Sequence, residues 1–139
     1  MENDKIADAL RELQEEIHAD NVKAGWWKDL TAIPEQSDLV RHARQGTRLG
    51  KAVVAEKLCL VHSEVSEAME GARKNLMDDK LPHRKMLEVE LADAVIRILD
   101  LCGALELDLA GAIQEKRQFN QTRDDHKVEN RMKDGGKAY

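Results

Sequence analysis

The sequence contains few of the residues that favour β-sheets. Its only aromatic residues are two tryptophans, one phenylalanine and one tyrosine, and runs of β-branched and aromatic residues in strict alternation are absent. Proline, which interrupts helices, occurs only at positions 34 and 82. Charged and aliphatic residues with helical spacing fill most of the chain. We therefore expect an all-α fold.

Cysteine is equally scarce, and no hydrophobic run is long. Cys59 and Cys102 lie within apolar helical patterns and offer neither a zinc-ligand spacing nor a disulfide framework. We interpret them as buried thiols in a reducing cytoplasm. The first residues lack the basic flank and apolar core of a signal peptide, and no apolar run approaches the roughly 18 residues of a membrane span. These absences predict a cytoplasmic protein with no membrane contact.

An excess of positive charge is also lacking. The net charge of −5 argues against nucleic acid as the main partner, because phosphate backbones are bound chiefly by lysine and arginine. The only basic cluster runs from Arg41 to Lys51, and a solvated loop explains it without a nucleic-acid partner. We expect no nucleic acid to bind.

The length of 139 residues fits a single domain, 1–139, with one core over about residues 4–123. Apolar residues at helical spacing predict four helices, over residues 4–24, 49–75, 83–105 and 108 to about 123. Residues 28–48 show no clean period. Because a structureless loop of this length is uncommon, it either contains a short helix or acts as a mobile lid. The polar tail, 124–139, is expected to be poorly ordered or lid-like.

Two of the expected helices carry pairs of acids beside apolar stripes that we expect to be buried. The stripes consist of Val54, Leu58, Val61, Val65, Ala68 and Ala72 on the first helix, and of Leu87, Leu91, Ala94, Ile98, Leu101 and Leu105 on the second. Glu64 and Glu67 lie three residues apart on the first of these helices, and Glu90 and Asp93 lie three apart on the second. If the stripes pack together, the carboxylates approach where water is scarce and must be protonated, paired with bases or bound to a cation. A cluster of oxygen ligands suits Mg²⁺, and Mg²⁺ on helix carboxylates suggests phosphate chemistry.

Ordinary surface charge remains an alternative for these acids. The chain contains 27 acidic residues, so pairs such as Glu12 and Glu15 reach the same spacing by chance. A di-iron centre is a poorer interpretation, because such bundles need two Glu-x-x-His motifs and only Glu15 and His18 form one.

Other candidate site residues lie on the first and fourth expected helices. Lys116, Asn120 and Arg123 share one helix face, which is either a polar binding surface or ordinary exposed helix. The tryptophans that follow the first helix, Trp26 and Trp27, are either a hydrophobic anchor for its end or an aromatic platform for a base.

The order of these motifs is similar to that of a known family. Glu64-x-x-Glu67, then 22 residues, Glu90-x-x-Asp93 and Lys116-x-x-x-Asn120-x-x-Arg123 resemble the MazG-like all-α nucleoside triphosphate pyrophosphohydrolases. The resemblance covers roughly residues 52–125. It implies a bundle of four to five helices, with the acidic site between the second and third helices and completed by oligomerisation.

The family resemblance also implies an activity and a set of ligands. The reaction is the hydrolysis of (deoxy)nucleoside triphosphates to monophosphate and pyrophosphate, a housecleaning of nucleotide pools. The four acids would bind Mg²⁺, with Mn²⁺ as a substitute, and one of them would activate the attacking water. Lys116 and Arg123 would contact phosphate, and Asn120 phosphate or sugar. The protein would be a homodimer or homotetramer.

Related dCTP pyrophosphatases contact the nucleotide through a histidine and a tryptophan nine residues later, and His18 and Trp27 have this spacing. Two features depart from those enzymes. The connection over residues 28–48 is much longer, and Arg97 stands four residues after the last acid, where an aromatic residue is common. Two other functions stay open: a non-catalytic helical oligomerisation or regulatory module, and a metal-dependent hydrolase of another phosphorylated substrate.

Overall fold

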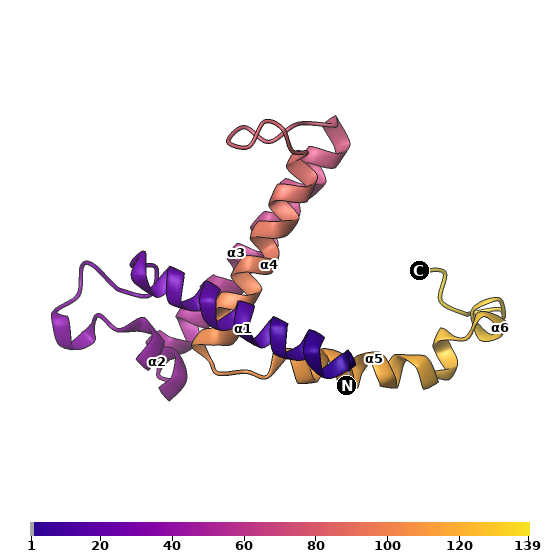
Figure 1. Cartoon of the computed structure of the whole chain (residues 1–139), viewed down its shortest axis with the longest axis horizontal. Coiled ribbons are helices and arrows are strands. Elements are labelled where there is room, and N and C mark those ends of the chain that lie inside the picture. Colours follow the sequence, from indigo (N-terminus) through magenta and orange to yellow (C-terminus); the bar gives the residue numbers. More distant parts are fainter. Residues whose placement is uncertain (1) are drawn as a thin grey trace. The chain divides into compact units, whose positions relative to one another are not determined.

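The computed structural model describes residues 2–139 and consists of helices and their connections (Figure 1). The elements are α1 (Glu2–Lys23), η1 (Pro34–Gln36), α2 (Leu39–Gln45), α3 (Arg48–Lys74), α4 (Met86–Ala104), α5 (Leu109–Thr122), η2 (Asp124–His126) and α6 (Val128–Arg131). Residues 2–139 contain no β-strand beyond two isolated bridges, so the all-α prediction is confirmed. Over the same residues, no helix combines the length and the apolar character that crossing a membrane requires.

The chain forms two compact units. The larger comprises Glu12–Leu107, and the smaller comprises the residues up to Arg11 together with Asp108–Tyr139. The long helix α1 therefore contributes to both units. The four predicted helices correspond to α1, α3, α4 and α5, and their ends agree with the prediction within two residues except at the start of α4.

In the larger unit, α3 and α4 form a long antiparallel hairpin (Figure 1). Its connection is ordered by Asp78, which is buried and accepts hydrogen bonds from the backbone N–H groups of Lys80 and Leu81 at 3.0 and 2.7 Å. A backbone bridge between Met77 and Lys85 closes the connection. The prediction that this helix starts at His83 is therefore wrong: the bridge holds Lys85 in an extended conformation, and α4 begins at Met86.

The core of the larger unit lies near the start of α3 and the end of α4. Its buried members are Trp27, Ala43, Val53, Leu101 and Ala104. Ala43 belongs to α2, the short helix within the long connection over residues 28–48. The short-helix interpretation of that connection is therefore confirmed. Trp27 is only 3% exposed, which also confirms the interpretation of this residue as a hydrophobic anchor after α1.

The apolar stripes of α3 and α4 are covered only in part. Ala68, Ala94 and Leu101 are buried as predicted, but Leu58 and Leu91 are 49% and 45% exposed. Val65 and Leu87 are exposed as well, and so is Cys59, so the interpretation of both cysteines as buried thiols is wrong for Cys59 and confirmed for Cys102. The expectation that the whole stripes are buried is therefore wrong for the single chain, because a two-helix hairpin covers one seam and leaves the remaining apolar surface open.

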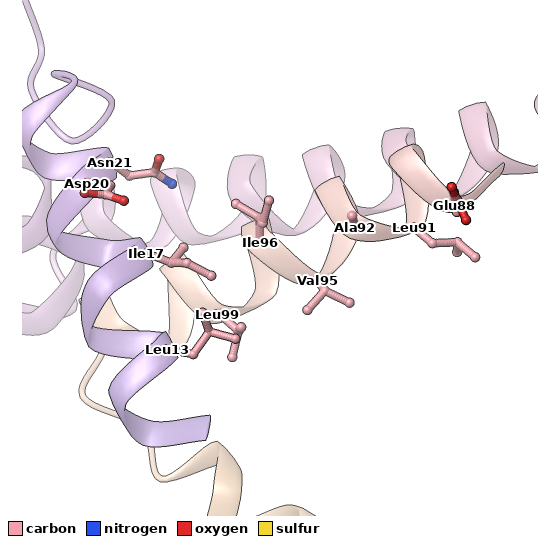
Figure 2. A pocket seen from close by; sticks show the side chains of 10 residues that line it. All are labelled: Leu13, Ile17, Asp20, Asn21, Glu88, Leu91, Ala92, Val95, Ile96 and Leu99. Carbon is pink, nitrogen blue, oxygen red and sulfur yellow. The ribbon is translucent and has the colours of Figure 1, made fainter. Parts of the chain in front are cut away.

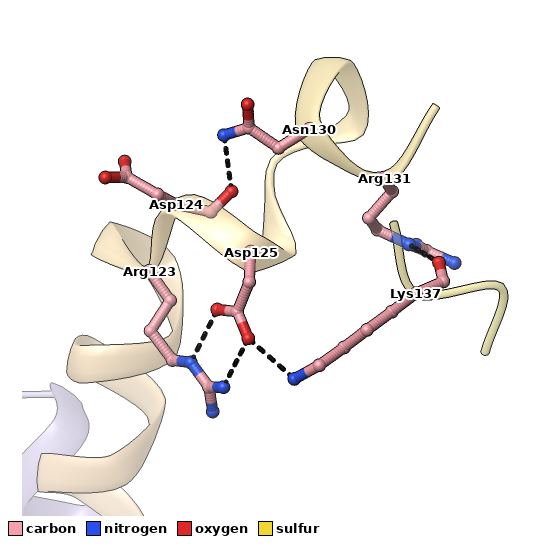
Figure 3. A network of polar contacts seen from close by, with 6 residues as sticks. All are labelled: Arg123, Asp124, Asp125, Asn130, Arg131 and Lys137. Carbon is pink, nitrogen blue, oxygen red and sulfur yellow. Dashed lines mark hydrogen bonds and ion pairs between the residues drawn. The ribbon is translucent and has the colours of Figure 1, made fainter. Parts of the chain in front are cut away.

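The smaller unit has its own local contacts. Asp108 caps α5 by accepting a hydrogen bond from the Gly111 N–H at 3.1 Å, and its carboxylate also pairs with Arg11 at 3.2 Å. Of the two predictions for the tail, poor order disagrees with the helical segments η2 and α6, and a lid-like role stays a prediction. Asp125 explains this difference, because it binds Arg123 and Lys137 and so ties the start of the tail to its end (Figure 3).

Gly50 provides a test of the packing of α2 on α3. A methyl group at this position would overlap the backbone carbonyl of His42, which neither helix can move easily. We expect Gly50→Ala to lower the free energy of unfolding by about 1–3 kcal/mol, although alanine normally favours a helix. Urea unfolding followed by circular dichroism measures the change. Ser66→Ala, at an exposed position of α3, is the control and should stay within about 0.5 kcal/mol of the natural protein. Equal stability of all three proteins would contradict the packing.

Candidate functional site

Three of the four predicted acids meet between α3 and α4. Each of Glu64, Glu90 and Asp93 offers a carboxylate oxygen, and these oxygens lie within 4.8 Å of one another. Glu64 comes from α3 and is buried, whereas Glu90 and Asp93 come from successive turns of α4 and are half-buried. We call these three residues the acidic cluster. An arrangement of this kind can hold a divalent cation through oxygen ligands alone.

The fourth acid, Glu67, lies beside the acidic cluster and is exposed. Its negative charge and a side-chain hydrogen bond both raise the pKa of Glu90. Glu67 is therefore a close neighbour of Glu90, one turn along α3 from Glu64. Its exposure leaves it open to water and to a bound ligand.

The protonation of the acidic cluster reflects its crowding. Burial raises the pKa of Glu90 to about 7, helped by hydrogen bonding to Glu64 and by the charges of Glu67 and Glu64. Burial and the charge of Glu64 also raise the pKa of Asp93. A divalent cation would favour the ionised forms of these carboxyls and would displace the proton from Glu90. The donor set therefore suits a hard cation such as Mg²⁺ or Mn²⁺.

Arg97 is a part of the site that sequence reasoning did not assign. Its Nε donates a hydrogen bond to Glu64 Oε1 at 2.6 Å, so it neutralises the buried member of the acidic cluster. The available signal was its position, four residues after Asp93 on the same face of α4. The sequence alone showed Arg97 only as a departure from the family pattern.

The acidic cluster opens into a cleft of about 410 Å³, within the usual range for small-molecule sites. The cleft is lined by Asn21, Trp26, Glu56, Lys57, Leu60, Glu64, Asp93, Ile96, Arg97 and Asp100. Lys57 precedes Glu64 by seven residues on α3, and Asp100 follows Asp93 by seven on α4. Because the helices are antiparallel, Lys57 and Asp100 lie together about 10 Å along the hairpin from the acids. The cleft therefore has an acidic end, formed by the acidic cluster, and a mixed end, where the positive Lys57 lies beside the negative Asp100.

Asp100 connects the two residues that were predicted to contact the nucleotide base. Its Oδ1 accepts a hydrogen bond from Trp27 Nε1 at 2.8 Å and lies 2.8 Å from His18 Nδ1. The rings of His18 and Trp27 meet edge to face, with centroids 5.7 Å apart. Trp27 offers no open ring face, whereas its neighbour Trp26 is 68% exposed and lines the cleft. Contact of His18 and Trp27 with a nucleotide stays a prediction.

The other predicted substrate ligands lie on α5 and at its end, in the smaller unit. Lys116 Nζ and Arg123 Cζ lie 4.9 and 5.6 Å from the centroid of the Phe119 ring. Arg123 also binds Asp125 through Nε and Nη2 at 2.9 and 2.6 Å, and this interaction lowers the pKa of Asp125 (Figure 3). Asn120 Oδ1 is buried without a hydrogen-bond partner. These residues keep polar capacity for a ligand, but Arg123 would first have to share its guanidinium with Asp125.

An apolar groove lies between α4 and α1 and adjoins the cleft, with which it shares Asn21 and Ile96. Figure 2 shows Leu13 and Ile17 of α1 facing Val95 and Leu99 of α4. The groove has a volume of about 670 Å³ and is also lined by Asp20, Asn21, Glu88, Leu91, Ala92 and Ile96. Its lining is suited to apolar side chains rather than to phosphate.

The raised pKa of Glu90 predicts how stability depends on pH. Between its ordinary value of 4.5 and about 7, the folded protein holds a proton on Glu90 that the unfolded chain releases. Without divalent cations, the free energy of unfolding should therefore fall as pH rises through this window. Glu90→Gln should flatten the slope and be more stable than the natural protein at pH 7.5. Urea unfolding in EDTA between pH 4.5 and 8 measures this pH dependence of the free energy of unfolding.

The control for this experiment is Glu88→Gln, which removes an exposed acid of α4 that pairs with Arg84 at 3.2 Å. It should leave the slope unchanged. If Glu90→Gln and Glu88→Gln gave the same pH dependence, the crowding of the acidic cluster would not control this stability.

Comparison with known proteins found no matching family model, no matching curated protein and no matching solved structure. The likeness to the MazG-like pattern therefore rests on the ordered motifs of the sequence. The geometry adds the acidic cluster, its neighbour Glu67 and the cleft. These are the features on which a function can be argued.

Proposed function

We propose that the protein is a Mg²⁺-dependent nucleotide pyrophosphohydrolase of the MazG-like type. It would cleave (deoxy)nucleoside triphosphates to the monophosphate and pyrophosphate and so remove unwanted nucleotides. The observation that carries the proposal is the approach of Glu64, Glu90 and Asp93 to within 4.8 Å of one another, next to a cleft of nucleotide size. Such clusters of oxygen ligands suit the cations that accompany phosphates.

The acidic cluster would hold the cation, and Mn²⁺ would substitute for Mg²⁺. When bound, the cation supplies charge neutralisation for phosphate oxygens and lowers the pKa of a bound water. Glu64 is fixed by burial between the helices, and Glu90 and Asp93 are fixed by their spacing on α4. The backbone positions of the three ligands would therefore be set by two packed helices, which favours catalysis by positioning.

Glu67 is the best candidate for handling the attacking water. It borders Glu90 but is the exposed member of the four acids, so it can accept a hydrogen bond or a proton from water. We assign it the role of orienting and deprotonating water. Lys116, Asn120 and Arg123 remain the proposed ligands of phosphate and sugar, as the family resemblance implies.

The exposed apolar surface of the hairpin supports a homodimer or homotetramer. Leu58, Val65 and Met69 on α3 are 49–58% exposed, and Leu91 and Val95 on α4 are 45% and 51% exposed. Apolar surfaces of this extent usually mark contact with another protein. We propose that copies of the chain cover these surfaces and that the active site is completed in the assembly.

A second candidate function is a non-catalytic helical oligomerisation module. The apolar groove between α1 and α4 favours it, and Arg97 neutralises Glu64 without any cation. In this case the acidic cluster would serve only to fix the register of α3 against α4. The two candidates differ in their response to metal and to nucleotides.

The reaction is tested by incubating the purified protein with a panel of ribo- and deoxynucleoside triphosphates, with and without Mg²⁺. We expect monophosphate and pyrophosphate, separated by ion-exchange chromatography, and no turnover without metal. Glu67→Ala should reduce kcat by about 10²–10⁴-fold, as expected for loss of a general base. Glu70→Ala is the control, because Glu70 lies on the same helix and pairs with Lys74. Release of diphosphate and phosphate would contradict the proposed bond cleavage.

Metal binding is tested separately by thermal unfolding. A ligand of the folded state raises stability by mass action, by about 2.7 kcal/mol at a concentration 100 times its Kd. We expect Mg²⁺ to raise the Tm of the natural protein and of Glu88→Gln. Asp93→Asn should reduce the shift strongly, because it removes a charged ligand of the acidic cluster. An unchanged Tm in the natural protein, together with no turnover of any nucleotide, would favour the oligomerisation module.

A further inference from the structure

Two cationic side chains, Lys57 and Arg97, line the same cleft as the acidic cluster. They come from different helices, since Lys57 lies on α3 and Arg97 on α4. The activity proposed above leaves both without a role, and the sequence motifs had assigned them none. Four acids, Glu56, Glu64, Asp93 and Asp100, line the same cleft, so the two cations among them need an explanation of their own.

The position of Lys57 in the cleft disfavours the charged form of its side chain. Its ammonium donates a hydrogen bond to the backbone oxygen of Trp26 at 3.1 Å and lies 4.5 Å from the centroid of the Trp27 ring. Burial lowers the pKa of Lys57, and the nearby charge of Asp100 opposes this shift. Among the side chains that the structure describes, those of residues 4–139, no carboxylate oxygen lies within 4.0 Å of this ammonium. The hydrogen-bonding capacity of Lys57 is therefore only partly used.

Arg97 uses one edge of its guanidinium and is half-exposed. Its Nε binds Glu64 Oε1, and its side chain is 39% exposed. A planar guanidinium has five N–H donors arranged to bind carboxylate or phosphate oxygens in pairs. The Glu64 carboxylate is its only acidic partner among the side chains described, from residue 4 onward. Arg97 therefore has donors left for an anion in the cleft.

We propose that Lys57 and Arg97 form an anion subsite that binds a phosphate group of the nucleotide, and that Arg97 exchanges Glu64 for that phosphate when a cation occupies the acidic cluster. This inference rests on the proposed function, because it places the phosphate beside the same cluster. Arg97 lies one turn beyond Asp93, and Lys57 lies further along the hairpin, so the two cations lead from the acidic cluster toward the mixed end of the cleft.

The exchange follows from the charges in the cleft. Without a cation, Arg97 is the group that keeps the buried Glu64 from being an unpaired charge. A divalent cation at Glu64 would take over this role and would repel the guanidinium. The freed Arg97 and the half-buried Lys57 then bind an anion more favourably. Cation and phosphate should therefore strengthen each other's binding, and Arg97 should compete with the cation when phosphate is absent.

The test uses the full chain with two probes, Mn²⁺ alone and inorganic pyrophosphate. Mn²⁺ binding is measured by electron paramagnetic resonance, and pyrophosphate binding by calorimetry at saturating Mn²⁺. We expect Arg97→Met to bind Mn²⁺ several-fold more tightly than the natural protein, because Glu64 has lost its competitor. Arg97→Met and Lys57→Met should each bind pyrophosphate about tenfold or more weakly, the usual effect of losing a charged hydrogen bond.

Two further variants make the result specific. Arg84→Met removes one positive charge from α4 at an exposed pair with Glu88, and both affinities should stay unchanged. Arg97→Lys keeps the charge but not the paired donors, so its Mn²⁺ affinity should stay near that of the natural protein while its pyrophosphate binding is weakened. If Arg97→Met fails to fold because Glu64 is unpaired, Arg97→Lys still tests whether pyrophosphate binding needs the paired donors of the guanidinium.

The outcomes separate this inference from the proposed function. If the natural protein binds Mn²⁺ and hydrolyses nucleotides, but the Arg97 and Lys57 variants bind both probes normally, the anion subsite is wrong and the activity stands. If the natural protein binds no Mn²⁺, both proposals are overturned. Tighter Mn²⁺ and weaker pyrophosphate in Arg97→Met, with Arg84→Met unchanged, would support the exchange.

Discussion

The larger unit depends on the burial of the Glu64 carboxylate between α3 and α4. A buried charge without a partner costs several kcal/mol, so the surrounding groups must compensate it. Arg97 supplies a direct partner, and protonation of Glu90 removes a second negative charge from the same space. The acidic cluster thus has partners of its own without metal, and the proposed cation would have to replace both a proton and an arginine.

The mixed end of the cleft follows a different principle. Here a buried carboxylate, Asp100, is satisfied by Trp27 and His18, which come from outside the hairpin. The hydrogen bonds fix α1 and the segment after it against α4, and they leave Trp26 on the surface beside the cleft. The acidic end is therefore formed by two neighbouring helices, whereas the mixed end depends on the packing of α1.

The sequence predicted the features that depend on local spacing. Most helix ends and the pairing of acids at intervals of three follow from residues close in the chain, whereas the length of the connection over residues 28–48 left a short helix as one of two interpretations. It could not predict the partners of Glu64 and Asp100, because these depend on the rotation and register of α4 against α3 and α1. Nor could spacing tell that Trp27 is buried while Trp26 is exposed, since the turn at Gly25, with φ of 87°, decides which ring faces inward. The predicted burial of Leu58 and Leu91 failed because one hairpin cannot cover both sides of its own helices.

The direct connection between α3 and α4 has a consequence for how the protein folds. Glu64 lies 26 and 29 residues from Glu90 and Asp93, whereas His18 and Asp100 are 82 residues apart, and the chain between α3 and α4 is itself ordered by Asp78. Contacts of low sequence separation require little loop closure, and they form rapidly. The hairpin can therefore assemble before α1 reaches Asp100, so that the acidic end of the cleft exists earlier in folding than the end that is completed by Trp27.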